Sequence, residues 1–196
     1  MIDTARRKKL ALHLRHLSVG LTTNDEFEEA VTESITHGWL PEQYYRSKQV
    51  KNDDPIIQPM LDLCWGLYDD TRQHRLTKSD KLTKEALRII ARSILFLHSD
   101  REYEWSYFDT NNPLLKFSLK DLILTILTLG HHYIKKRKAH LISYYQWQQQ
   151  GEYDVWPFFR KIHYQNQLGF QPFLKRHEPT QTALAATINN GSKPSA

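Results

Sequence analysis

The chain has 196 residues, of which 40% are hydrophobic and 25% are charged, and its formal net charge is +5 at pH 7. This length and composition suit one globular domain with a substantial core, and they exclude a chain that is disordered throughout. With 7 glycines and 8 prolines the chain has too few turn residues for an all-β sandwich. The basic excess is compatible with a nucleic acid or an anionic surface as partner but indicates neither.

Cys64 is the only cysteine, which excludes an intramolecular disulfide and a cysteine-rich zinc site. The longest apolar stretch, residues 122–134, has 13 uncharged residues and is too short to span a bilayer. The basic residues 6–9 are followed by His13 and His16, which interrupt any apolar region of a signal peptide. We therefore expect a soluble cytoplasmic protein with a buried thiol.

Helical periodicity dominates the chain and predicts an all-α fold. Leu10, Leu14 and Leu17 recur on one face of a first helix. A second helix is expected to begin at Thr23, where Thr23 and Glu26 form a capping box. Further helices are expected over the ranges 54–68, 83–97 and 118–150, followed by a short segment at 160–168, with residues 39–54 as a loop or a broken helical turn. Whether 118–150 is one helix or is divided at Gly130 stays open.

These elements predict a single domain over residues 1–178, followed by a disordered tail at 179–196. We expect about five or six helices packed antiparallel around one core, with aromatic-rich loops closing the ends. The expected core is made of apolar positions on the helices: Leu14, Leu17, Phe27, Val31, Leu63, Cys64, Leu67, Ile90, Ile94, Leu97, Leu122, Ile126 and Leu129.

Two segments, 99–105 and 152–158, interleave carboxylates with large aromatic side chains directly after helical runs. Trp105 and Trp156 are expected to be mostly buried and to anchor these loops against helix ends. Asp100 and Asp154 cannot be buried unpaired, so we expect them to accept hydrogen bonds from backbone N–H groups or from an arginine.

No strong catalytic motif is present. The chain lacks a nucleophile elbow, a P-loop and a dinucleotide fingerprint, and its histidines lack the spacing of a helical metal site. No cofactor or metal is therefore expected. A hydrolase remains an alternative only if folding brings His98, Asp100 and Asp69 together in a pocket near residues 98–104.

Nucleic-acid binding is a second alternative, carried by basic clusters at 6–9, 135–138 and 160–176 with aromatic residues near two of them. The candidate binding residues are Lys135, Lys136, Arg137 and Lys138. These four lie within one predicted helix, so their charges spread around it instead of forming a stripe. Binding to a membrane surface is less favoured, because the apolar and basic residues of 118–150 follow one another in series.

The leading hypothesis is a non-catalytic protein-interaction module, such as an adaptor or an immunity-type partner that blocks another protein. It depends on aromatic side chains that the sequence places outside the predicted core and that interfaces commonly use. These candidate interaction residues are Trp39, Tyr44, Tyr45, Tyr144, Tyr145 and Trp147.

Several short sequence motifs, in the order in which they occur, resemble those of a family of small bacterial proteins to which no activity is assigned. They lie at residues 14–17 with 23–28, 65–70, 95–100 with 103–105, and 154–158. The resemblance covers most of residues 10–175 and implies one domain of bacterial origin. It carries no catalytic residue to this chain.

Overall fold

The computed structural model describes residues 1–108 and 118–169, and all regular structure in these two ranges is helical. The all-α prediction is therefore confirmed. The helices are α1 (Thr4–Ser18), α2 (Asn24–Ser34), α3 (Pro41–Arg46), α4 (Gln49–Asn52), α5 (Ile57–Trp65), α6 (Lys84–Leu97), α7 (Leu119–Leu127), α8 (His131–Gln148) and α9 (Lys161–Leu168), with single 3-10 turns at Lys78–Asp80 and Tyr153–Val155.

The described ranges contain more helices than the five or six expected. Within residues 39–54 the chain forms the short helices α3 and α4, so the broken helical turn is the correct one of the two expected alternatives and the loop is not. Gly130 adopts φ +88°, a left-handed conformation, and divides the predicted 118–150 helix into α7 and α8. The capping box is present as predicted: Glu26 N–H donates to Thr23 Oγ1 over 3.2 Å, and Thr23 N–H donates to Glu26 Oε2 over 2.8 Å.

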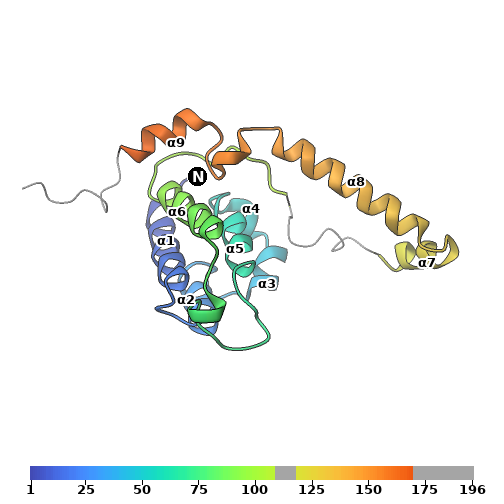
Figure 1. The fold of residues 1–196 in the computed structure, drawn as a ribbon, viewed down its shortest axis with the longest axis horizontal. Helices are drawn as coiled ribbons and strands as arrows, with labels where there is room; N and C mark the ends of the chain where they lie inside the picture. Colours follow the sequence, from blue (N-terminus) through green and yellow to red (C-terminus); the bar gives the residue numbers. More distant parts are fainter. Residues whose placement is uncertain (109–117, 170–196) are drawn as a thin grey trace, which may run out of the picture.

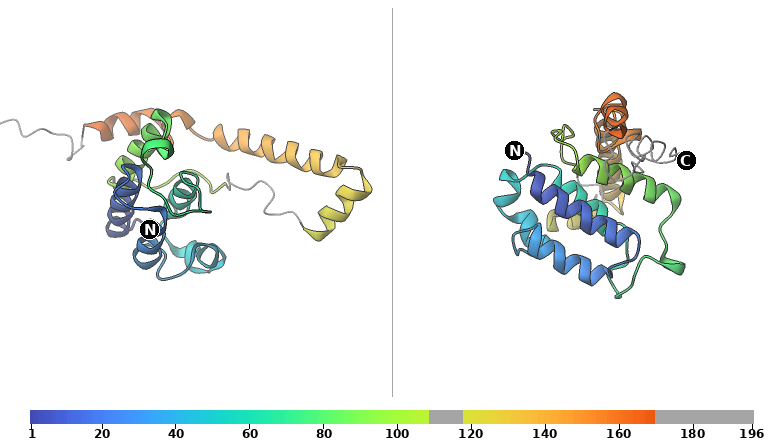
Figure 2. Two further views of the ribbon diagram at one scale, coloured as in Figure 1. Left: turned by 60° about the horizontal axis from the view of Figure 1, so that its bottom comes forward. Right: turned by 90° about the vertical axis from the view of Figure 1, so that its left-hand side faces the viewer.

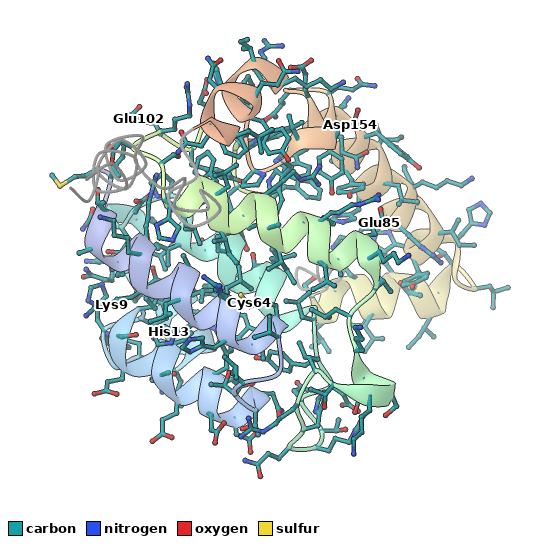
Figure 3. All side chains as sticks on the ribbon, turned by 60° about the vertical axis from the view of Figure 1, so that its left-hand side comes forward. Lys9, His13, Cys64, Glu85, Glu102 and Asp154 are labelled. Atoms are coloured by element: carbon teal, nitrogen blue, oxygen red, sulfur yellow. The ribbon has the colours of Figure 1, made fainter. Side chains whose placement is uncertain are left out.

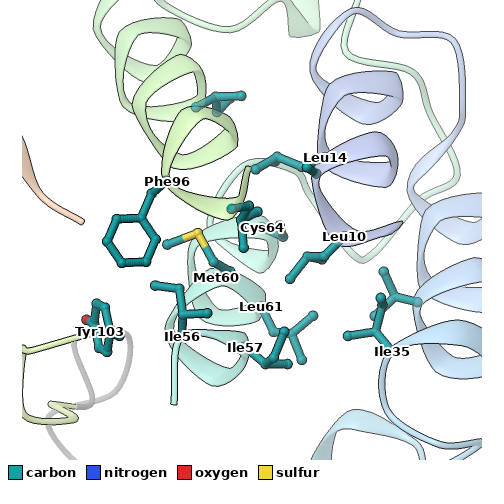
Figure 4. Packing of buried hydrophobic residues seen from close by; sticks show 14 of the residues in the cluster. Leu10, Leu14, Ile35, Ile56, Ile57, Met60, Leu61, Cys64, Phe96 and Tyr103 are labelled. Atoms are coloured by element: carbon teal, nitrogen blue, oxygen red, sulfur yellow. The ribbon is translucent and has the colours of Figure 1, made fainter. Parts of the chain in front are cut away.

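A packed body is built on α1, which lies against α2 and α6, while α9 lies against α6 (Figure 1, Figure 2). Its centre joins α1, α5 and α6: Leu10, Leu14, Met60, Cys64 and Phe96 meet there, fully or almost fully buried (Figure 4). Burial raises the pKa of the Cys64 thiol well above its ordinary value. The predicted burial of this thiol is therefore confirmed.

A buried pair of charges fastens α1 to the start of α5. Arg7 Nε and Nη2 donate to the two carboxylate oxygens of Asp54 over 2.6 and 2.9 Å, and neither side chain is exposed. The remaining guanidinium nitrogen, Nη1, donates to the carbonyls of Ser99 and Arg101 over 3.1 and 2.7 Å. One arginine thus ties together α1, α5 and the segment that follows α6.

Arg6 and Asp53, which directly precede Arg7 and Asp54 in the sequence, belong to a second, more open cluster. Arg6 Nη2 lies 3.1 Å from Asp53 Oδ2, and the Tyr44 hydroxyl donates to the same oxygen over 2.6 Å. His37 Nε2 is 3.4 Å from that carboxylate. Asp53 therefore joins α1 to α3, and these partners lower its pKa despite partial burial.

The helices α7 and α8 form an arm, residues 118–148, that projects from the body (Figure 1, Figure 2). The prediction that all helices pack around one core is wrong for this arm. Seven of the expected core residues are buried in the body, and Leu63, Leu67 and Ile94 pack at the core edge. Leu122, Ile126 and Leu129 are exposed on the arm instead, because α7 packs against α8 at the far end of the arm (Figure 1).

No helix in 1–108 or 118–169 is long and apolar enough to cross a membrane. The predicted tail at 179–196 lies outside the described residues.

Alanine substitutions at two glycines that follow helices can distinguish the free-energy cost of a left-handed backbone from that of a steric clash. Gly20 and Gly38 have φ of +70° and +80°, but only at Gly20 would an added Cβ meet a neighbour, Thr77 Cγ2, at 2.3 Å. Gly38→Ala is expected to cost about 1–2 kcal/mol from backbone strain alone. Gly20→Ala should cost more, as measured by urea denaturation; equal losses would contradict the close approach to Thr77.

Candidate interaction surfaces

The two acid–aromatic segments meet each other in the fold. Trp105 Nε1 donates to the Phe158 carbonyl over 3.3 Å, and Trp156 Nε1 donates to the Tyr103 hydroxyl over 3.2 Å. The Phe96 ring of α6 packs edge-on against Phe158, with ring centroids 5.1 Å apart. The segments therefore form one structure, held over the end of α6 by reciprocal contacts.

The expected anchoring is correct for the rings and wrong for the acids. Trp105 is 3% exposed and Trp156 is partly buried. Asp100 is exposed. In the same turn, the backbone carbonyls of its neighbours Ser99 and Arg101 accept hydrogen bonds from Arg7. Asp154 is also exposed, 3.4 Å from Lys161 Nζ, and only its backbone carbonyl accepts a hydrogen bond from Arg92.

The carboxylate that caps a helix in this region is Glu152. Its Oε2 accepts a hydrogen bond from the backbone N–H of Lys161 over 2.6 Å, at the start of α9. A negative charge is favourable at that end of a helix. The sequence indicated the right segment for this contact but not the right acid, because capping depends on how the turn at 153–155 folds.

A cleft with a volume of about 680 Å³ opens between α5 and α6, next to the aromatic segments. Clefts that bind small molecules commonly have volumes of about 300–1,000 Å³. One wall comes from α5 and the residues just after it, the other comes from α6, and aromatic rings close one end. The lining residues are Pro59, Asp62, Leu63, Gly66, Leu67, Glu85, Arg88, Ile89, Arg92, Tyr103, Phe108, Trp147, Tyr153, Asp154 and Trp156.

Charges of both signs surround the apolar part of this cleft. Glu85 and Arg88 are exposed on neighbouring turns of α6, and Glu85 lies on the same side of the molecule as Asp154 (Figure 3). Across the cleft, Asp62 Oδ2 accepts a hydrogen bond from the Tyr107 hydroxyl over 3.1 Å. In the ranges 1–108 and 118–169, neither Glu85 nor Arg88 is in an ion pair.

Stacked rings hold the aromatic end of the cleft in place. Trp147 packs against Trp105 and Phe108 with centroid distances of 5.1 and 5.8 Å, and its Nε1 donates to the Ser106 carbonyl over 2.7 Å. Burial and the Tyr153 hydroxyl raise the pKa of Tyr144 to about 12. The Tyr144 hydroxyl therefore stays protonated at neutral pH and acts as a neutral hydrogen-bonding group.

The six candidate interaction aromatics fall into three groups. Trp39 and Tyr145 are exposed, as the hypothesis requires. Tyr45 and Tyr144 are partly buried against the core. The expectation of exposure is wrong for Tyr44, which binds Asp53 from within the core, and for Trp147, which is 6% exposed.

The residues of the predicted basic clusters differ in their exposure and ion pairing. Arg6 and Arg7 are buried in ion pairs, so cluster 6–9 presents only Lys8 and Lys9 to solvent. On the arm, Lys136 Nζ binds Asp121 Oδ2 over 2.6 Å. The other three candidates, Lys135, Arg137 and Lys138, are exposed. In cluster 160–176, Arg160 and Lys161 are exposed, and residues 170–176 lie outside the described ranges.

The groups of the hydrolase alternative lie on different parts of the body. Asp69 hydrogen-bonds with Thr71 and lies beside Arg72 in the α5–α6 connection. His98 follows the C-terminal end of α6, a 14-residue helix about 20 Å long, whereas that connection leads to its N-terminal end. None of Asp69, His98 and Asp100 lines the cleft. In the residues that the structure describes, no group of three or more His, Cys, Asp or Glu side chains could hold a metal ion.

The polar stripe of α6 was missed from the sequence. Glu85, Arg88 and Arg92 recur at three and four residues along one face of α6, and all three line the cleft. This spacing was visible, but a solvated helix face and the wall of a cleft have the same pattern.

Comparison with known proteins gives no relative: no family model, no curated protein and no solved structure matches this chain. The resemblance to small bacterial proteins stays a prediction.

Proposed function

We propose that the protein is a non-catalytic interaction module that binds a segment of another protein in the α5–α6 cleft. The observation that carries this proposal is the composition of the cleft, in which tryptophan and tyrosine rings lie beside arginine side chains. Tryptophan, tyrosine and arginine are the residue types that contribute most to binding energy at protein interfaces.

The chemistry of the cleft favours an extended segment with an apolar anchor and a neighbouring carboxylate. Leu63, Leu67 and Ile89 provide an apolar wall for the anchor, beside the aromatic rings. Arg88 is exposed at the rim, where its guanidinium group can bind a carboxylate through two hydrogen bonds. The rings already pack on one another, so little ordering is needed when a segment binds.

Selection from a random peptide library displayed on phage tests this proposal. We expect the enriched peptides to share an apolar anchor flanked by Asp or Glu. Ile89→Arg, which fills the cleft, should weaken the binding of a selected peptide at least about tenfold, a loss of about 1.4 kcal/mol. Leu12→Arg is the matched control, because Leu12 is an exposed apolar residue of the body outside the cleft.

A failure to enrich any peptide would contradict the proposal. So would enriched peptides that bind the Ile89→Arg variant as tightly as the unchanged protein. Arg88→Glu should select against the acidic flank while the anchor is retained, which separates the role of the arginine from that of the apolar wall.

A further inference from the structure

The arm exposes the apolar face of α7 and turns its polar edge inward. Leu119, Leu122, Ile123, Ile126 and Leu127 have the spacing of one helix face, and all five are between 47% and 75% exposed. The polar edge faces α8, where Asp121 accepts from His132 Nε2 over 2.9 Å and from Lys136 over 2.6 Å. On the helices of the body, by contrast, the apolar face is buried against the core.

Exposed apolar side chains are concentrated on the arm. Of the 20 large hydrophobic side chains exposed in the described residues, 10 lie within residues 118–148. At the tip, Leu129 is 97% exposed next to the Gly130 turn. An apolar patch of this kind on a protein surface is typical of an interaction site, because water contact with it is unfavourable.

The arm also holds most of the net charge of the chain. It contains Lys120, Lys135, Lys136, Arg137 and Lys138 but a single acid, Asp121. The arm therefore carries +4 of the formal +5. Asp121 is already bound to Lys136 and His132, and these contacts hold its pKa far below the usual range.

We propose that the arm binds an anionic lipid surface, with the apolar face of α7 inserted between lipid chains and the lysines near the phosphates. Interfacial helices combine an apolar face with nearby basic residues in this way. The sequence places the apolar and basic residues in series, but the turn at Gly130 folds α7 back against α8, where Lys136 reaches Asp121 of α7.

Charge and shape distinguish this partner from the others. A second copy of the chain would bring two arms of charge +4 together, and like charges repel. A nucleic acid would use the lysines but leave the apolar face of α7 in water. The arm projects from the body (Figure 2), which suits insertion of α7 into a lipid layer, whereas a protein groove would have to enclose it.

Flotation of the full chain with vesicles tests the proposal. We expect binding to vesicles of phosphatidylcholine with phosphatidylglycerol, weaker binding to phosphatidylcholine alone, and a decrease as salt is raised. Ile126→Glu should reduce binding at least about tenfold, because it places a charge in the inserted face. The control is Leu21→Glu, the same charge change at an exposed apolar residue of the body.

Lys135→Gln with Lys138→Gln should also weaken binding and reduce its dependence on salt, since both lysines are exposed. Circular dichroism and thermal melts of every variant show whether it is folded. The proposal is overturned if the full chain does not float with anionic vesicles, or if the folded Ile126→Glu variant floats as well as Leu21→Glu.

Two other results would assign the arm to a different partner. A dimer in analytical ultracentrifugation that Ile126→Glu dissociates, without vesicle binding, would assign the apolar face to a second copy. Binding to single-stranded oligonucleotides that depends on the lysines but not on Ile126, again without vesicle binding, would assign the arm to a nucleic acid. Because the arm and the cleft are tested with different variants and probes, either proposal can fail alone.

Discussion

Arg7→Met is expected to lower the free energy of unfolding by about 3–5 kcal/mol, the range for removing one partner of a buried ion pair. The variant leaves the Asp54 carboxylate fully buried with no countercharge. It also removes the donors to the carbonyls of Ser99 and Arg101. Chemical denaturation monitored by circular dichroism measures the loss.

Two further variants make this prediction specific. Lys8→Met changes the adjacent but exposed cation, and we expect its effect to stay within about 0.5 kcal/mol. Arg7→Met combined with Asp54→Leu should lose less stability than Arg7→Met alone, because no unpaired charge remains buried. A loss below 1 kcal/mol for the single variant would mean that the pair is open to water.

Trp105→Ala is expected to destabilise the protein by about 3–5 kcal/mol, as for other buried aromatic residues replaced by alanine. Trp105 packs against Trp147, Tyr153 and Phe159, with centroids 5.1, 6.1 and 5.2 Å away. The substitution therefore leaves a cavity where the base of the arm meets the body.

Trp39→Ala is the matched control, because Trp39 is 47% exposed. Its melting temperature should change much less than that of Trp105→Ala. Trp156→Ala should fall between the two, since its ring is only partly buried. An unchanged melting temperature for Trp105→Ala would contradict the packed aromatic cluster and would make Trp105 a binding residue instead.

Local signals in the sequence predicted the elements well. Thr23 with Glu26 and Thr83 start helices as expected, because a cap depends on residues three apart. The all-α class follows from the same short-range periodicity. The division at Gly130 was left open, because glycine tolerates both a helix interior and a left-handed turn.

Long-range pairing could not be read from the sequence. Arg6 and Arg7 look like part of a basic run, and only the fold brings them to Asp53 and Asp54, about 47 residues away. The apolar spacing of α7 predicts a buried helix in the same way as that of α1. Whether such a face meets the core or remains open depends on where the chain turns, so Leu122, Ile126 and Leu129 were assigned to the core wrongly.

The central claim, an apolar helix held outside the packed body, is tested most directly by thiol labelling of an Ile126→Cys variant under native conditions. Cys64 is an internal reference, because it is fully buried and burial raises its pKa. We expect one label per chain at position 126, added about as fast as to an unfolded peptide, while Cys64 reacts only after denaturant is added. If the thiol at position 126 is protected as strongly as Cys64, α7 is packed in the core and the account of the arm is wrong.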